Sequence, residues 1–135
     1  MSKIKITTIA NVGDTKEMSS DYAMYGTAQV WVNFNAATAS GTGTGSIRDS
    51  FNVASITDNG TGNMTINFEV DFPDTDYCWV GHAGDDYRTN YGTVGMGTYG
   101  IDAVGSVRVV QNRDDGGTYD PVYMHFIAYH ARTLG

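Results

Sequence analysis

Three histidines and one cysteine are the residues best suited to chemistry in this 135-residue chain. Cys78 and His82 lie in a segment that alternates like a β-strand, so we expect them on one face of it, about 13 Å apart. A thiolate–imidazole pair needs hydrogen-bonding distance, which this spacing does not provide. We therefore interpret Cys78 as a buried cysteine beside an ordinary histidine and expect no catalytic nucleophile here.

Histidines and acidic pairs also raise the question of a metal site. His125 and His130 fall on opposite faces of the last expected strand, so the histidines of one chain do not converge. A site on the threefold axis of an oligomer is the alternative. The acidic runs 85–86 and 114–115 offer the oxygen atoms that calcium prefers, but neither has the EF-hand spacing. We interpret both runs as solvated turns and predict no metal and no cofactor.

Other catalytic motifs are missing from the sequence. The glycine-rich run 41–45 lacks the lysine and the strand–helix context of a phosphate-binding loop. The sequence contains no serine nucleophile elbow, and no pair of carboxylates stands out as the acid and base of a glycosidase. We therefore predict that the protein is not an enzyme.

The loop-like segment 84–99 carries an unusual set of aromatic and polar side chains. Loop tyrosines give rigid, amphipathic contact area at low entropic cost, which suits recognition of a glycan or a protein. Packing in the core or between subunits explains such tyrosines at least as often, so both interpretations stay open. The candidate contact residues are Tyr87, Arg88, Asn90, Tyr91, Tyr99 and Tyr119.

Short β-strands would have to position these residues. The segments 30–34 and 64–70 place apolar residues at every second position, which is the period of a half-buried strand. Between them, residues 56–64 are rich in Asp, Asn and Gly, which tolerate the positive φ angles of a tight hairpin turn. We also expect one interrupted strand over 46–57, with a bulge near Asn52. Further strands are expected over residues 77–82, 104–111 and 122–130.

This pattern predicts an all-β protein. About eight short strands with turns every 8–12 residues are typical of an antiparallel β-sandwich or a jelly-roll-like domain. Seventeen glycines and a charged fraction of only 17% suit many short strands joined by tight turns. The length is that of a single domain. We place the sandwich over residues 27–135.

Residues 1–26 differ from the rest and are interpreted as an N-terminal arm. Their three lysines balance three acidic residues, whereas the remainder has twelve acidic residues against five arginines and carries the whole net charge of −7. We expect a short strand over 3–9 and a short helix over 14–25, capped by the first residue of that range. The expected anchoring residues of the arm are Ile4, Ile6 and Ile9.

Charge and hydropathy limit the possible partners. An acidic body argues against binding a nucleic-acid backbone, which requires a positive surface. The sequence has no stretch of membrane-spanning length and no apolar run typical of a signal peptide, so we expect no membrane insertion. A single cysteine excludes an intrachain disulfide and fits folding in a reducing cytoplasm.

Two segments resemble a known family. Residues 29–35 (QVWVNFN) and 43–62 (GTGSIRDSFNVASITDNGTG) are similar to a domain that recurs in tail-fibre-type proteins of marine and cyanobacterial phages. The resemblance extends over about residues 30–80, and residues 2–9 resemble the short N-terminal strand of such fibres. It implies a β-rich, non-enzymatic virion protein, usually a homotrimer, made in the cytoplasm of the host bacterium.

The resemblance leaves two virion locations open. Fibre proteins of this type normally carry a long shaft before the domain, whereas this chain consists of leader and domain. The first hypothesis is a short tail fibre or fibre tip, whose loops contact a glycan or protein on the host surface. The alternative is a capsid decoration or cement protein whose arm grips the shell. In either case the expected partners are other proteins of the tail or capsid.

Overall fold

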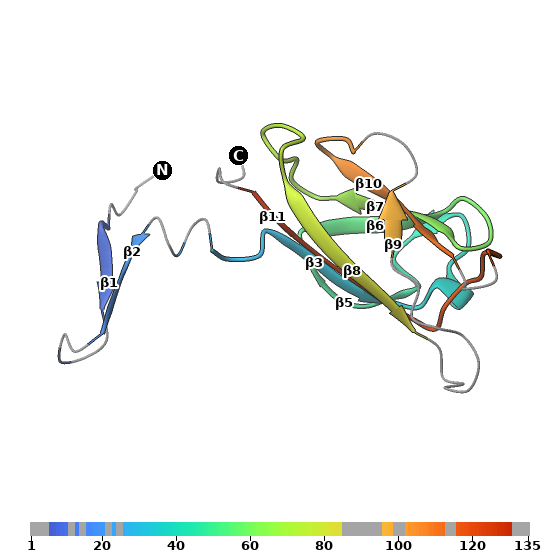
Figure 1. Ribbon diagram of the computed structural model, residues 1–135, viewed down its shortest axis with the longest axis horizontal. Coiled ribbons are helices and arrows are strands. Elements are labelled where there is room, and N and C mark those ends of the chain that lie inside the picture. The colour runs from blue at the N-terminus through green and yellow to red at the C-terminus, as the bar shows by residue number, and fades with distance from the viewer. Residues whose placement is uncertain are drawn as a thin grey trace.

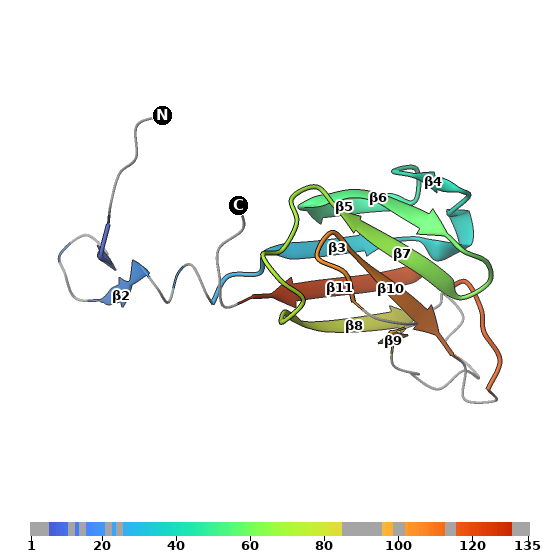
Figure 2. The same cartoon turned by 90° about the horizontal axis from the view of Figure 1, so that it is seen from above.

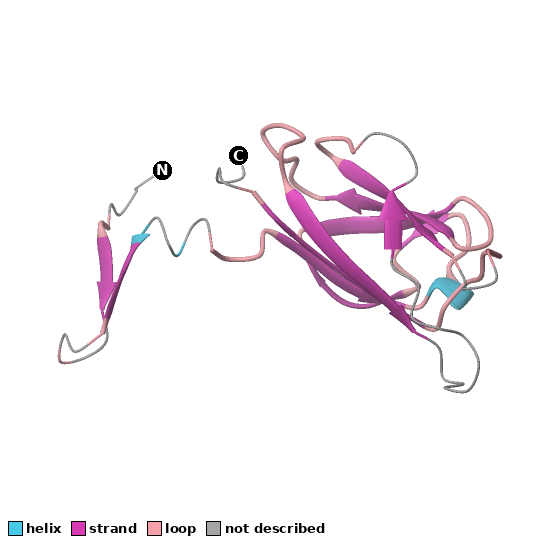
Figure 3. Cartoon of the chain, viewed as in Figure 1, coloured by secondary structure: helices cyan, strands magenta, loops and turns pink. Residues whose placement is uncertain are grey.

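The computed structural model describes residues 6–10, 13, 16–20, 23, 26–84, 96–98, 102–112 and 116–130, and this part of the chain is nearly all β. A short 3₁₀ turn, η1 (Ala36–Thr38), is capped by the side chain of Asn35 (Figure 3). The strands are β1 (Thr8–Ala10), β2 (Glu17–Ser19), β3 (Val30–Phe34), β4 (Thr42–Gly43), β5 (Ile47–Phe51), β6 (Val53–Asp58), β7 (Asn63–Phe68), β8 (Cys78–Gly84), β9 (Met96–Thr98), β10 (Ser106–Gln111) and β11 (Tyr123–Tyr129).

Two antiparallel sheets pack face to face to form the body, as Figures 1 and 2 show from two directions. One sheet has five strands in the order β4-β6-β7-β10-β9, and the other has four in the order β5-β3-β11-β8. The predicted antiparallel β-sandwich is therefore confirmed. The short strands β4 and β9 lie in segments whose composition had suggested loops, because two or three residues are too few to show a period of two.

The core fills the space between the two sheets and follows the alternation in the sequence. In β3, the side chains of Val30, Val32 and Phe34 are buried. They face the buried side chains of β6, β7 and β10 in the other sheet, while β11 adds its own buried positions. The buried apolar residues of these four strands are Ile56, Met64, Ile66, Phe68, Val107, Val109, Met124, Phe126 and Ala128. Because strand side chains alternate, every second residue is left for the outer faces.

The predicted hairpin turn is confirmed between β6 and β7. The amide of Asn59 donates to the carbonyl of Asn63, and Gly60 and Gly62 both have positive φ. Gly62 is also tightly surrounded: a Cβ atom there would lie 2.8 Å from the carbonyl oxygen of Gln111. Glycine is therefore required at this position both by backbone conformation and by space.

Asn52 marks a corner between the sheets, and the predicted bulge lies beside it, where the pairing of β6 with β7 shifts register between Val53 and Ser55. The prediction of a single interrupted strand over 46–57 is wrong, because β5 belongs to the four-stranded sheet and β6 to the five-stranded sheet. Asn52 has φ 56°, a left-handed conformation that asparagine tolerates better than most residues. Its side chain accepts a hydrogen bond from the amide of Val70 (2.7 Å) and donates to the same residue's carbonyl (3.0 Å). These bonds fix the change of direction.

The N-terminal arm is a β-hairpin where it is described. Strands β1 and β2 pair antiparallel, with Ile9 opposite Met18. The predicted helix over 14–25 is therefore wrong at residues 17–19, where pairing with β1 overrides a weak helical spacing; residues 14–15, 21–22 and 24–25 lie outside the described part. Figures 1 and 2 show that the hairpin stands apart from the sandwich.

An aromatic cluster ties the loop between β7 and β8 to the core. Phe72 stacks on Tyr77 with 4.4 Å between ring centroids, and it meets Phe68 edge to face at 5.3 Å. The buried hydroxyl of Tyr77 donates to the carbonyl of Ala103 (3.0 Å). Burial, and to a smaller extent the charge of Asp102, raise the pKa of Tyr77 well above its ordinary value of 10.0. The phenol therefore stays protonated and acts as a donor.

Candidate interaction surfaces

The predicted contact loop lies mostly outside the described residues. Tyr87, Arg88, Asn90, Tyr91 and Tyr99 all fall there, so their placement remains a prediction. The structure does place Tyr119, which is half-buried in the segment before β11. There the side chain of the following residue, Asp120, accepts a hydrogen bond from the amide of Gly62 (2.6 Å). This segment packs against the β6–β7 hairpin turn.

The arm presents apolar side chains to solvent. Ile6 is 55% exposed and Ile9 is 46% exposed, and Met18 opposite Ile9 is also exposed. Ile4 lies outside the described residues. Because large apolar side chains gain free energy when they leave water, these exposed side chains favour a contact with another surface. The structure thus shows two of the three predicted anchoring residues exposed; what they bind stays a prediction.

The outer face of the four-stranded sheet is the larger apolar surface. The register of the strands places Phe51, Trp31, Ile127 and Val80 side by side, one from each of β5, β3, β11 and β8. We call these four residues the apolar row. Phe51 is 54% exposed and Val80 is 61% exposed, although both lie in regular strands. An apolar row that crosses a whole sheet on its solvent side is unusual in a soluble domain.

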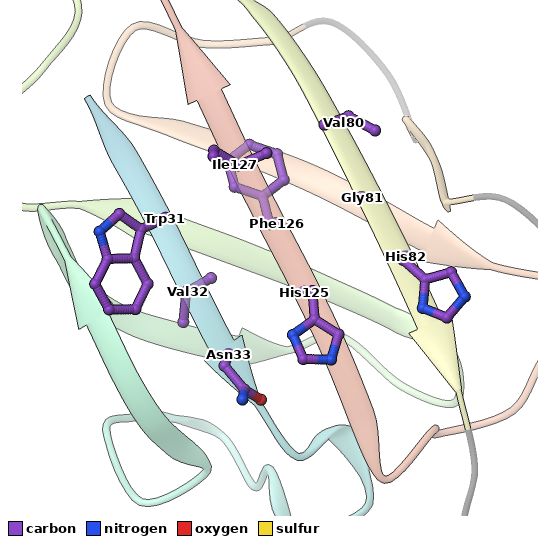
Figure 4. A pocket seen from close by; sticks show the side chains of 9 residues that line it. All are labelled: Trp31, Val32, Asn33, Val80, Gly81, His82, His125, Phe126 and Ile127. Carbon is purple, nitrogen blue, oxygen red and sulfur yellow. The ribbon is translucent and has the colours of Figure 1, made fainter. Parts of the chain in front are cut away.

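A polar row runs beside the apolar row on the same face. It consists of Asp49, Asn33, His125 and His82, again one residue from each strand in the same order. The two imidazole rings are 6.4 Å apart between centroids. An open hollow of about 470 Å³ lies over the middle of this face, as Figure 4 shows. Its lining residues are Trp31, Val32, Asn33, Val80, Gly81, His82, His125, Phe126 and Ile127.

Arg48 closes one side of this face. It is the extra residue where the pairing of β3 with β5 shifts register, so the local bulge re-aims its side chain. The guanidinium lies 4.7 Å from the ring centroid of Tyr123 and donates to the carbonyl of Val122 (2.8 Å). A second, longer bond of 3.3 Å reaches the side chain of Asn33. The cation is thus held in place at the border of the face.

The outer face of the five-stranded sheet has a different character. Its outward residues are mostly hydroxyl and amide side chains that bond to one another across the strands. The side-chain nitrogen of Asn67 lies 3.0 Å from the hydroxyls of both Ser55 and Thr57. Arg108 donates to the side chain of Asn63 (2.9 Å). The chain itself therefore provides hydrogen-bonding partners for these side chains.

The three histidines and the cysteine do not gather into a site, and the acidic runs 85–86 and 114–115 lie outside the described residues. Cys78 is opposite Tyr129 and His82 is opposite His125, so the cysteine and histidine are well separated on β8, as expected. The prediction that Cys78 is buried is wrong: it is exposed, because its side of β8 is the outer face. Among the described residues, no three His, Cys, Asp or Glu side chains are close enough to share a metal ion.

His125 and His130 lie on opposite sides, as predicted. His125 is exposed on the outer face, whereas His130 is buried and its Nε2 lies 2.7 Å from a carboxylate oxygen of Asp74. The buried histidine connects the end of β11 to the loop before β8. Its role in the described structure is to hold that loop, together with a tilted ring contact to Phe72 at 5.7 Å.

Sequence reasoning missed the apolar row. The signal was present in the strand around Trp31, where an apolar residue stands on the side opposite Val30 and Val32, and in Ile127 and Val80 of later strands. What could not be seen was their alignment, since β3, β8 and β11 are far apart in the chain. Only the register brings them into one line.

Comparisons with known proteins do not identify a family for this chain. No protein-family model, curated protein or solved structure matches the chain. The described residues include no helix that is both long and apolar enough to cross a membrane.

Proposed function

We propose that this chain is a bacteriophage virion structural protein: a short tail-fibre or fibre-tip module, homotrimeric and without catalytic activity, attached to the particle by its N-terminal arm. The observation that carries the proposal is the arm itself. A hairpin that exposes Ile6, Ile9 and Met18 stands apart from a compact sandwich. Such a division suits a protein whose arm attaches to the particle and whose sandwich faces the surroundings.

The resemblance to phage fibre domains supports the proposal through the residues it covers. The matching segments include Trp31 in β3, the corner at Asn52 and the turn at 59–62. These positions shape the sandwich and its outer face, so the resemblance rests on residues with structural roles. In the fibre interpretation, the loop around 85–99 contacts a glycan or protein on the host surface.

A capsid decoration protein is the second candidate, and the same arm favours it. Apolar side chains on a projecting hairpin could fill a joint between shell proteins, where burial contributes about 25 cal/mol per Å² before entropic costs. Localisation on the virion separates the two candidates. Immunogold labelling or cryo-EM of particles would place a fibre at the tail and a cement protein over the capsid.

The arm is tested by point substitution in the full chain. We expect Ile9→Asn to weaken attachment to the particle at least about tenfold, because it replaces an exposed apolar contact with a polar one. Thr8→Asn is the matched control, since Thr8 is the neighbouring residue on the other side of the same hairpin. Co-sedimentation with particles that lack the protein measures the effect. Equal binding of both variants would contradict the role of the arm.

A further inference from the structure

The apolar row requires an explanation that the chain alone does not supply. Phe51, Trp31, Ile127 and Val80 form an uninterrupted apolar line across four strands, with no charged residue in it. Ordered water at such a face costs free energy, and monomeric proteins rarely leave it uncovered. On the outer face of the other sheet, by contrast, polar side chains form hydrogen bonds with one another.

We propose that a neighbouring copy of this chain covers the outer face of the β5-β3-β11-β8 sheet, so that this face is the subunit interface of the homotrimer. The inference rests on the proposed function for the number of copies, and it adds which surface joins them. The apolar row would form the centre of the interface. The polar row and Arg48 would form its rim, which is the usual division between interface core and border.

The charge distribution favours another copy of the chain as the occupant. The protein carries a net charge of −7, so two copies repel one another over most of their surface. Of the acidic residues that the structure describes in the body, only Asp49 lies on this face, and Arg48 beside it balances its charge. Among the described residues this face thus carries one cation and one anion, so a second copy meets less repulsion here than over the acidic remainder.

The size of the face also fits. Two strands of five residues and two of seven, at about 4.8 Å spacing, give a flat area of about 390 Å². Side-chain relief increases the accessible area above this value, and a specific interface takes about 800 Å² from each partner. The sheet face alone therefore provides more than about half of a specific interface, and the rim supplies the remainder.

A charge placed in the apolar row tests the proposal. We expect Val80→Lys to weaken association by more than about a hundredfold, because an unpaired cation would be buried between copies. Val70→Lys is the matched control: Val70 is 45% exposed, lies outside this sheet and gives the same net charge. Light scattering after size exclusion measures the molar mass of the wild type and both variants. Circular dichroism verifies that both variants are folded.

Cys78 gives an independent measurement, because it is the only cysteine and points from this face. We expect a thiol reagent to label the native wild type at least about tenfold more slowly than Val80→Lys. A closed oligomer that Val80→Lys disrupts and Val70→Lys preserves would support the proposal. A monomeric wild type, an oligomer that Val80→Lys leaves intact, or equal labelling of Cys78 would overturn it.

Measuring association and attachment to particles separately distinguishes failure of the interface proposal from failure of the proposed function. A monomer that still attaches to phage particles would overturn the interface and leave the virion role standing. An oligomer held by this face that attaches to no particle would do the reverse. If the monomeric wild type instead binds a soluble glycan on this face, the occupant is a ligand and the interface proposal is wrong.

Discussion

Side chains alternate between core and solvent in both sheets of the sandwich, but one outer face is polar and the other carries an apolar row. On the five-stranded sheet, outward hydroxyl and amide groups bond to one another, as Asn67 does with Ser55 and Thr57. On the four-stranded sheet, one row of outward positions carries Phe51, Trp31 and two other apolar residues. One surface pairs polar side chains within the chain, and the other exposes large apolar side chains.

This difference is the basis for the proposal that a neighbouring copy covers one face. A polar face gains little from being covered, because its groups already have partners within the chain. An apolar face gains free energy with every contact that removes water. A binding surface of this kind therefore requires no catalytic motif. It requires a strand register that aligns apolar side chains on one outer face.

The largest effect should come from truncating the aromatic centre of the apolar row. We expect Trp31→Ala to weaken association by about a hundredfold, since buried Trp residues dominate interface energetics. Thr65→Ala, at the middle of the polar face, should leave association unchanged. Sedimentation equilibrium measures both. If the two variants associate equally well, the distinction between the faces fails.

The same substitution on each face should then produce opposite results. Asn67→Ala removes bonds to Ser55 and Thr57, so we expect it to lower the free energy of unfolding by about 1–2 kcal/mol without changing association. The side chain of Asn33 accepts a long hydrogen bond of 3.3 Å from Arg48. Asn33→Ala should therefore lower stability less and weaken association more.

Urea unfolding at two protein concentrations separates these contributions. A loss that is independent of concentration belongs to the single chain, and a loss that grows on dilution belongs to the interface. We expect the first behaviour for Asn67→Ala and the second for Asn33→Ala. The reverse assignment would mean that the polar face, rather than the apolar one, joins the subunits.

The smallest expected effect is on the pH dependence of stability, and it comes from Tyr77 in the core between the two sheets. Tyr77 has a raised pKa in the folded state, so the unfolded chain loses its proton first as pH rises through about 10. Above that pH the folded state binds more protons, and stability should fall by up to about 1.4 kcal/mol per pH unit. Tyr77→Phe removes this slope while costing about 1 kcal/mol at neutral pH through the lost hydrogen bond.

Urea unfolding between pH 8 and 11 measures that slope as the difference between wild type and Tyr77→Phe. Taking the difference removes the contribution of other titrating groups. Parallel curves would show that Tyr77 is not the group responsible. Association should be unaffected, because Tyr77 is buried among Phe68 and Phe72 and does not reach the outer face.

Local patterns predicted the sandwich and most of its strands. Alternation over 30–34 and 64–68 identified the buried sides, and the Asn–Gly–Thr–Gly run identified the hairpin turn. The bulge near Asn52 was predicted, but the corner that separates β5 from β6 at this residue was not. A bulge and a corner have the same local signature, and only pairing with β3 or with β7 distinguishes them.

The interaction surface was harder to predict because it is a property of register. Trp31, Ile127 and Val80 come from strands that are distant in the chain, so no local window contains them. Cys78 was misplaced for a related reason: the apolar character of its segment did not reveal which side of β8 faces the core. The helix expected in the arm was wrong at residues 17–19, because they pair with β1 through contacts that a helical spacing cannot show.

Hydroxyl-radical footprinting of the native wild type against Val80→Lys is the most direct test of the account. We expect Phe51, Trp31 and Tyr123 to be modified slowly in the wild type and rapidly in the variant, while residues on the outer face of the five-stranded sheet serve as internal references. Equal modification of Phe51 and Trp31 in the two proteins would show that the apolar face meets water in both, and would contradict the account.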